Sequence, residues 1–261
     1  SGVLNGLKKQ AEKLGYDITF INTCFENRKM SYYDHCRYRN FEGVAIVCAD
    51  FNEPDVVELM NSELPVVTID YVHHNCTAVT SNNIQGIEEL VKYIYSQGHR
   101  KIAYIHGQEG STVTRERLAS FYRAVDELGL ELPENYIRTA NYLEIQGAAE
   151  QTKELLSLPN PPSCIIYPDD TSLIGGRNVI FERGMKIPQD ISVAGYDGTQ
   201  ISQILYPKLT TIKQNTELIG EEAAIRLVGA IEKPKTTLVE RVVIEGNLVP
   251  GQSVGMIQVD E

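Results

Sequence analysis

The amino-acid sequence predicts an α/β protein in which helices alternate with parallel strands, in a doubly wound arrangement of two lobes. Short apolar strands and amphipathic helical patterns follow one another along the chain. Strands in the first third and in the later part both end in acidic residues, as expected of two similar lobes. The length of 261 residues also approaches the size, about 250–300 residues, at which single hydrophobic cores stop growing.

The chain opens on a helix, because apolar residues recur at helical spacing from Val3 to Leu14 and Gly15 follows as a C-terminal stop. Residues 17–22 (DITFIN) then read as a strand. A doubly wound sheet normally begins with a strand, so one more strand is expected upstream of this sequence.

The alternation continues through the rest of the chain. Strands are predicted at residues 44–49, 66–69, 102–106, 164–167 and 191–194. Helices are predicted near residues 54–61, 84–97, 115–128, 145–157 and 172–183. Capping signals mark the helix ends: Ser81-Asn82-Asn83 precedes one helix, Gly98 follows it, and Ser111 is a candidate cap for the next.

Acidic residues at the strand ends are the first candidates for a site. They are Asp50, Asp70, Asp169 with Asp170, and Asp197 in the segment Gly195-Tyr196-Asp197-Gly198. Carboxyl ends of central parallel strands open toward ligand sites, and ionised carboxylates accept several O–H or N–H donors, which suits ligands rich in hydroxyl groups. An Asp after a strand can equally be a turn former or a helix cap.

Composition and motifs exclude several functions. Lys and Arg number 24 against 35 Asp and Glu, a net charge of −11, so the surface of this chain is poorly suited to gripping nucleic acid. Five scattered cysteines without a C-x-x-C pair fit a reducing cytoplasm, and no apolar run approaches the ~20 residues of a membrane span. No P-loop, G-x-S-x-G elbow or metal-binding histidine spacing is present, so no catalytic residue, cofactor or metal is predicted. Paired carboxylates leave a glycoside hydrolase as an open alternative.

Four motifs together resemble the LacI/GalR family of bacterial transcription regulators: GHRKIAYIHG at 98–107, TRERLASF at 114–121, IPQDISVAGYDG at 187–198 and PKLTTIKQ at 207–214. The resemblance covers the effector-binding core. It implies the type I periplasmic-binding-protein-like fold, with two Rossmann-like lobes, a ligand cleft between them, three crossings and homodimerisation. One lobe would comprise residues 1–80 and about 214–236, with its first strand missing, and the other residues 81–213 and about 237–261. Members of the family carry a DNA-binding helix-turn-helix domain before this core, and that domain is not in this sequence.

The resemblance also assigns site residues. Arg117 and Asp197 fall on the ligand-contacting arginine and aspartate of the family, and such a pair can bracket neighbouring sugar hydroxyls as donor and acceptor. Tyr142 falls where an aromatic residue stacks on the ligand. Asp170 falls on a polar position after CIIYP, while Asp169 departs from the Asn that is more common in the family. Asp50 and Asp70 are the candidates in the first lobe.

The leading hypothesis is therefore the sensing core of a cytoplasmic transcription regulator, a repressor that binds a small sugar or sugar derivative. It is not expected to be an enzyme. As a homodimer it would control operator DNA through the absent domain by a shift between conformations. The alternative is a periplasmic sugar-binding protein of an ABC importer, which shares the fold. A secretion signal in the full gene would favour the importer, and a helix-turn-helix the regulator.

Overall fold

The computed structural model describes residues 2–22, 24–25 and 28–258. The chain divides into two compact units: unit 1 comprises Ser1–Ser81 and Asn215–Ile244, and unit 2 comprises Asn82–Gln214 and Glu245–Glu261. The third division follows Ile244, later than the expected boundary near residue 236. The reason is that β11 (Arg241–Ile244) pairs with β5 (Thr77–Ser81) of unit 1.

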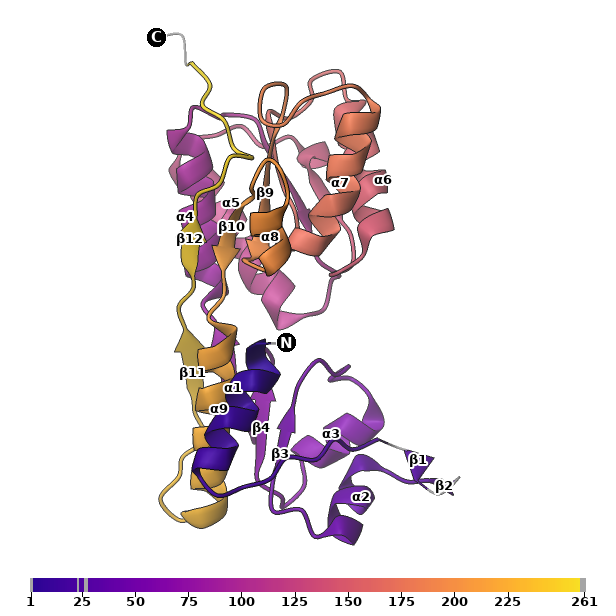
Figure 1. The fold of residues 1–261 in the computed structure, drawn as a ribbon, viewed down its shortest axis with the longest axis vertical. Coiled ribbons are helices and arrows are strands. Elements are labelled where there is room, and N and C mark those ends of the chain that lie inside the picture. The colour runs from indigo at the N-terminus through magenta and orange to yellow at the C-terminus, as the bar shows by residue number, and fades with distance from the viewer. Residues whose placement is uncertain (1, 23, 26–27, 259–261) are drawn as a thin grey trace. The chain divides into compact units, whose positions relative to one another are not determined.

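Unit 1 contains a parallel sheet in the order β11-β5-β4-β3, with β4 at Val66–Ile69 and β3 at Val44–Ile46. Helix α1 (Gly2–Lys13) lies alongside α9 (Thr216–Glu232), as Figure 1 shows, and both pack on one face of the sheet. Apolar residues of α2 (Tyr32–Arg39) and α3 (Pro54–Met60) form a second core cluster with β3 and β4. The short strands β1 (Cys24–Phe25) and β2 (Arg28–Lys29) pair antiparallel with each other.

The predicted strand at residues 17–22 is wrong, because no strand forms there. Ile18 and Phe20 are exposed instead of packing on a sheet. A strand needs a neighbour to pair its backbone N–H and C=O groups. Within the described part of the chain, this segment has no such neighbour, and the edge strand β3 pairs with β4 alone.

Unit 2 contains a six-stranded sheet in the order β12-β10-β9-β8-β6-β7. Its strands are β6 (Ile102–His106), β7 (Ile137–Thr139), β8 (Cys164–Ile166), β9 (Ser192–Asp197), β10 (Thr210–Lys213) and β12 (Asn247–Val249). All neighbouring strands pair parallel except β10 and β12, which pair antiparallel. The predicted α/β class with parallel sheets is confirmed, with one antiparallel edge strand added.

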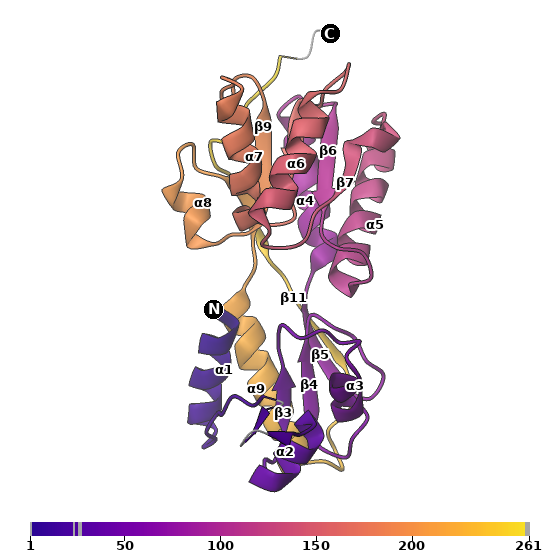
Figure 2. The same ribbon diagram turned by 90° about the vertical axis from the view of Figure 1, so that its right-hand side faces the viewer.

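Helices cover both faces of this sheet (Figure 2). Those of one face are α4 (Asn83–Ser96) and α5 (Thr112–Glu127), and those of the other are α6 (Ile145–Leu156) and α7 (Asp170–Glu182). Successive residues of β6 alternate between the two layers: Ile102 and Tyr104 pack with the α4–α5 side, and Ala103 and Ile105 with the α6–α7 side. The strands of the sheet interior are therefore apolar on both faces, which explains their continuous hydrophobic runs.

The structure shows side-chain caps at two of the predicted helix starts. Ser111 caps α5, because its hydroxyl accepts the N–H of Thr114. Asn82 caps α4, because its side-chain oxygen accepts the N–H of Gln85.

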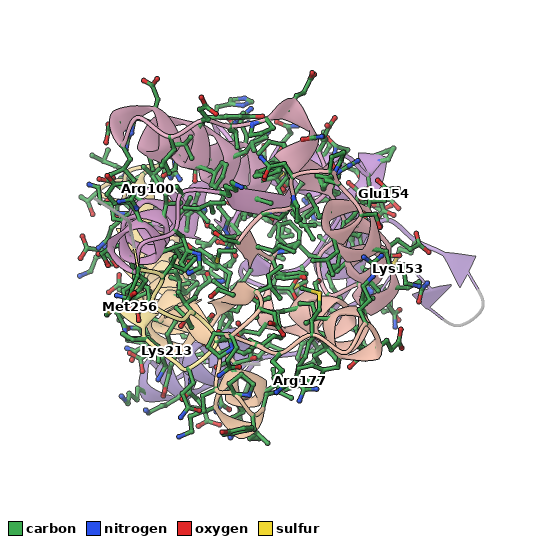
Figure 3. The ribbon with its side chains drawn as sticks, turned by 90° about the horizontal axis from the view of Figure 1, so that it is seen from above. Arg100, Lys153, Glu154, Arg177, Lys213 and Met256 are labelled. Carbon is green, nitrogen blue, oxygen red and sulfur yellow. The ribbon has the colours of Figure 1, made fainter. Side chains whose placement is uncertain are left out.

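Charged side chains such as Arg100, Lys153 and Arg177 lie around the periphery of unit 2, seen from above in Figure 3. Among the described residues, no helix has the length and apolar character needed to cross a bilayer.

Candidate ligand site at the strand ends of unit 2

Arg117 is a buried cation held in one orientation. It belongs to α5, and its side chain is 4% exposed. Its Nε donates to Asn83 Oδ1 at 2.9 Å and its Nη1 to the carbonyl of Pro168 at 3.2 Å. The guanidinium carbon lies 3.6 Å from the centre of the Tyr196 ring. Burial opposes the charge, but the Tyr196 and Tyr142 phenols and a nearby carboxylate raise the pKa of Arg117, so the guanidinium stays ionised.

Asp197 ends β9 and supplies that carboxylate. Its Oδ1 lies 4.0 Å from Arg117 Nη2, and its side chain is 26% exposed. The same oxygen accepts a hydrogen bond from Gln214 Nε2, just beyond β10. The backbone of Asp197 has φ 96°, a conformation that residues with side chains rarely adopt and that often marks functional sites. The donor group of Arg117 and the acceptor group of Asp197 thus lie close to each other in unit 2.

Tyr142 borders the same group of residues. It precedes α6, and its phenol oxygen lies 2.9 Å from Thr114 Oγ1 in the first turn of α5. Its ring crosses Gly107 so closely that a Cβ there would lie 2.2 Å from ring atoms. The ring centre is 5.7 Å from the Arg117 guanidinium carbon. The structure therefore brings three predicted residues, Arg117, Asp197 and Tyr142, into one cluster.

Asp170 is buried beneath Asp197 in the structure and has no exposed surface. Its Oδ1 accepts the Thr211 hydroxyl at 2.7 Å. Its Oδ2 accepts both the backbone N–H and the hydroxyl of Thr199, at 2.8 and 3.0 Å. Burial raises the pKa of Asp170 to about 6, and the charge of Asp197 adds to the effect, although the hydrogen bonds from Thr211 and Thr199 oppose it. Through Thr199, Asp170 fixes the turn that follows Asp197.

The two first-lobe candidates follow strands of unit 1: Asp70 comes directly after β4, and Asp50 lies four residues beyond the end of β3. Asp50 is exposed and accepts the N–H of Asn52 within its own turn, at 3.0 Å. Asp70 follows β4 with φ 60°, and its Oδ1 accepts the N–H of Ser81 at 3.4 Å. Beside them, the rings of Phe51 and Tyr71 stack with centroids 4.2 Å apart and planes 3° apart.

Sequence reasoning missed three of the residues that shape these sites: Asn83, Gln214 and Phe51. Asn83 was read as part of a cap signal, and only the folded chain shows that Asn82 is the cap while Asn83 binds Arg117. Gln214 directly follows β10, and this position was the available signal for it, whereas Phe51 lies five residues beyond the end of β3. Within the residues that the structure describes, no group of three or more His, Cys, Asp or Glu is arranged to hold a metal ion.

Comparison with known proteins identifies the family. A model described as a periplasmic binding protein-like domain matches residues 91–254. The chain therefore belongs to the family of periplasmic binding protein-like domains. It is 29% identical over 207 residues to the protein named probable HTH-type transcriptional repressor ExuR in Bacillus subtilis, which covers 78% of this chain and 62% of that protein. It is 26% identical over 239 residues to the ribose operon repressor of Escherichia coli, covering 90% and 72% of the two chains. These repressors confirm the predicted likeness to LacI/GalR regulators.

Solved structures agree on the fold. A LacI transcriptional regulator from Bacillus cereus subsp. cytotoxis matches with a TM-score of 0.88 and 25% identity, over 98% of this chain and 92% of that one. A LacI family regulator from Enterococcus faecium with bound ribose matches with a TM-score of 0.84 and 21% identity, over 98% and 94%. The periplasmic-binding-protein-like fold expected from the sequence is thereby confirmed.

Proposed function

We propose that this chain is the effector-sensing core of a LacI-type transcriptional repressor, and that its effector is a small sugar or sugar derivative. The observation that carries the proposal is the Arg117–Asp197 pair, a fixed guanidinium beside a partly exposed carboxylate. Adjacent hydroxyls of a sugar present both acceptors and donors, so one can accept from Arg117 while the next donates to Asp197. Tyr142 adds an aromatic surface beside them, on which the apolar face of a sugar ring can pack.

The names of the relatives support regulation over import. The relatives cited above are called repressors, and one of them is the ribose operon repressor. One structural neighbour holds ribose, and another is a regulator CelR in complex with cellobiose. An effector that binds one conformation more tightly than another shifts their populations, and this shift would control operator binding by a helix-turn-helix domain of the full-length protein.

Direct contacts are proposed for Arg117, Asp197 and Tyr142, with Asp50 and Asp70 as candidates from unit 1. For Asp170 we propose an indirect role, because its oxygens already accept from Thr211 and Thr199. Homodimerisation, the form expected of this class of regulator, is also proposed and is measured by sedimentation equilibrium.

Calorimetric titration with ribose, cellobiose, glucose and galactose tests the proposal. At least one sugar should bind. Arg117→Lys and Asp197→Asn should each lower the affinity for that sugar about tenfold or more, since a hydrogen bond to a charged group contributes about 1.5–3 kcal/mol. Arg123→Ala is the matched control: Arg123 lies on the same helix, is exposed, and binds Glu88 at 3.2 Å. Unchanged affinity in both site variants would rule out the assignment of this pair.

A further inference from the structure

Asp169 connects the start of α7 to the loop that carries Tyr142. Its side chain is buried, and its Oδ1 accepts the N–H of Ser172 at 2.8 Å, which caps the helix. Its Oδ2 accepts the Ser172 hydroxyl and also the N–H of Leu143, each at 2.8 Å. We infer that Asp169 is a positioning residue that fixes residues 141–144 and, through them, the ring of Tyr142. Its relevance to effector binding rests on the proposed function.

The conformation of Leu143 shows why such a bond is needed. Leu143 has φ 61°, in the left-handed region where a leucine is rare, and the residue is 66% exposed, so packing does little to hold it there. A backbone in this region is strained for a residue other than glycine and persists where its surroundings enforce it. The bond from the Leu143 N–H to a buried carboxylate is such a constraint, and the residue it constrains is the neighbour of Tyr142.

Two other residues hold Tyr142 by hydrogen bonds, and both come earlier in the sequence. Gln108 accepts its backbone N–H at 3.2 Å, and Thr114 contacts its phenol at 2.9 Å. The Asp169 bond holds the following residue. Without it, Leu143 can relax toward an ordinary negative φ, and the direction of the chain beyond Tyr142 changes.

A carboxylate performs this double task better than an amide. Asn is as good a helix cap as Asp, so in Asp169→Asn the amide oxygen can still accept the N–H of Ser172. The amide nitrogen then faces the N–H of Leu143, donor against donor, and that hydrogen bond is lost. Asp169→Asn therefore keeps the cap and removes the loop bond. Ser172→Ala is the matched control, because it removes the contact of the Ser172 hydroxyl with Oδ2 and leaves both the cap and the Leu143 bond in place.

Amide hydrogen exchange of the full chain, followed by NMR, tests the backbone part. We expect the Leu143 amide to exchange about tenfold or more faster in Asp169→Asn and to stay within about twofold of the unsubstituted chain in Ser172→Ala. If Asp169→Asn folds poorly, Asp169→Ser replaces it, because the serine hydroxyl can cap the helix but is too short to reach Leu143. The Leu143 amide should then exchange faster in Asp169→Ser, as expected for Asp169→Asn. Unchanged exchange in a folded Asp169 variant, or equal acceleration in Ser172→Ala, overturns the inference.

Fluorine NMR of the chain labelled with 3-fluorotyrosine tests the ring. The Tyr142 resonance is assigned as the one that disappears in Tyr142→Phe. It should shift or broaden in Asp169→Asn and keep its position in Ser172→Ala, and an unmoved resonance in Asp169→Asn contradicts the positioning role. Neither measurement uses an effector, so a failed sugar titration would count against the proposed function and leave this inference to be decided by its own results.

Discussion

The buried carboxyl of Asp170 should lower the free energy of unfolding as the pH rises from about 4 to about 6. Its pKa is raised from 3.8 to about 6, first by burial and then by the charge of Asp197, against hydrogen bonds from Thr211 and Thr199. In the unfolded chain the carboxyl has its ordinary pKa of about 3.9. Between these values the folded protein binds more protons at this group than the unfolded one, so the stability that protonated Asp170 contributes is fully present below about pH 4 and is lost as the pH passes 6. The difference between the two pKa values corresponds to about 3 kcal/mol.

Asp170→Asn isolates this contribution, because the amide has similar shape and does not titrate. Unfolding by urea is followed from pH 4 to pH 7.5 for both proteins, and the titrating groups that do not interact with Asp170 cancel in the difference. Asp170→Asn should gain about 3 kcal/mol relative to the unsubstituted chain across that range, on top of any constant offset from altered hydrogen bonds. Asp190→Asn is the control, since Asp190 is exposed and accepts the N–H of Lys186 in a turn. A flat difference for Asp170→Asn, or one of opposite slope, would refute the reasoning by showing that hydrogen bonding outweighs burial.

Three further experiments test other contacts. Gly107→Ala places a Cβ 2.2 Å from ring atoms of Tyr142, so the ring must move, and sugar affinity should fall about tenfold in calorimetric titration while the protein stays folded. Arg117→Met removes two hydrogen bonds donated by a buried charge and should lower the free energy of unfolding by about 3–5 kcal/mol in urea; a loss under 1 kcal/mol would mean that desolvation cancels those bonds. A double-mutant cycle of Phe51→Leu and Tyr71→Leu should give a coupling of about 0.5–1.5 kcal/mol for the stacked rings, and additive losses would contradict the stacking.

Strong periodicity explains why most of the fold could be predicted. Strands β6, β8 and β9 of unit 2 are apolar on both faces and bounded by turn residues, and they lie within a few residues of their predicted positions. The strand prediction at residues 17–22 was wrong because an alternation of apolar and polar residues shows only that a segment could form a strand. Whether it does depends on a partner elsewhere in the chain. Short elements such as β7 and α8 (Gln200–Ile204) carry too few residues for a periodic signal and were missed.

Residues of the candidate site could be chosen from the sequence where the choice depends on position along a strand, and less so where it depends on the direction of a side chain. Asp197 and Arg117 could be chosen from strand ends and motifs. Asp169 and Asp170 could not be told apart, since both follow the same strand. In the folded chain one reaches the loop before α6 and the other reaches the loop after β9. Side-chain direction at the first residues of a helix decides this, and sequence spacing does not show it.

That divergence changes what the acidic strand ends mean. The sequence suggested a site with many carboxylate acceptors for sugar hydroxyls. In unit 2, however, Asp169 and Asp170 accept backbone N–H and hydroxyl groups of the protein itself, and Asp197 is the partly exposed carboxylate of the group. Two buried acids thus support the loops that carry Tyr142 and Asp197, while Asp197, the acid beside Arg117, is the one that we propose as an effector contact. Selectivity in unit 2 should then depend on the spacing between Arg117 and Asp197 more than on the number of carboxylates. Substitutions at Asp169 and Asp170 should alter that selectivity only by moving the loops they hold.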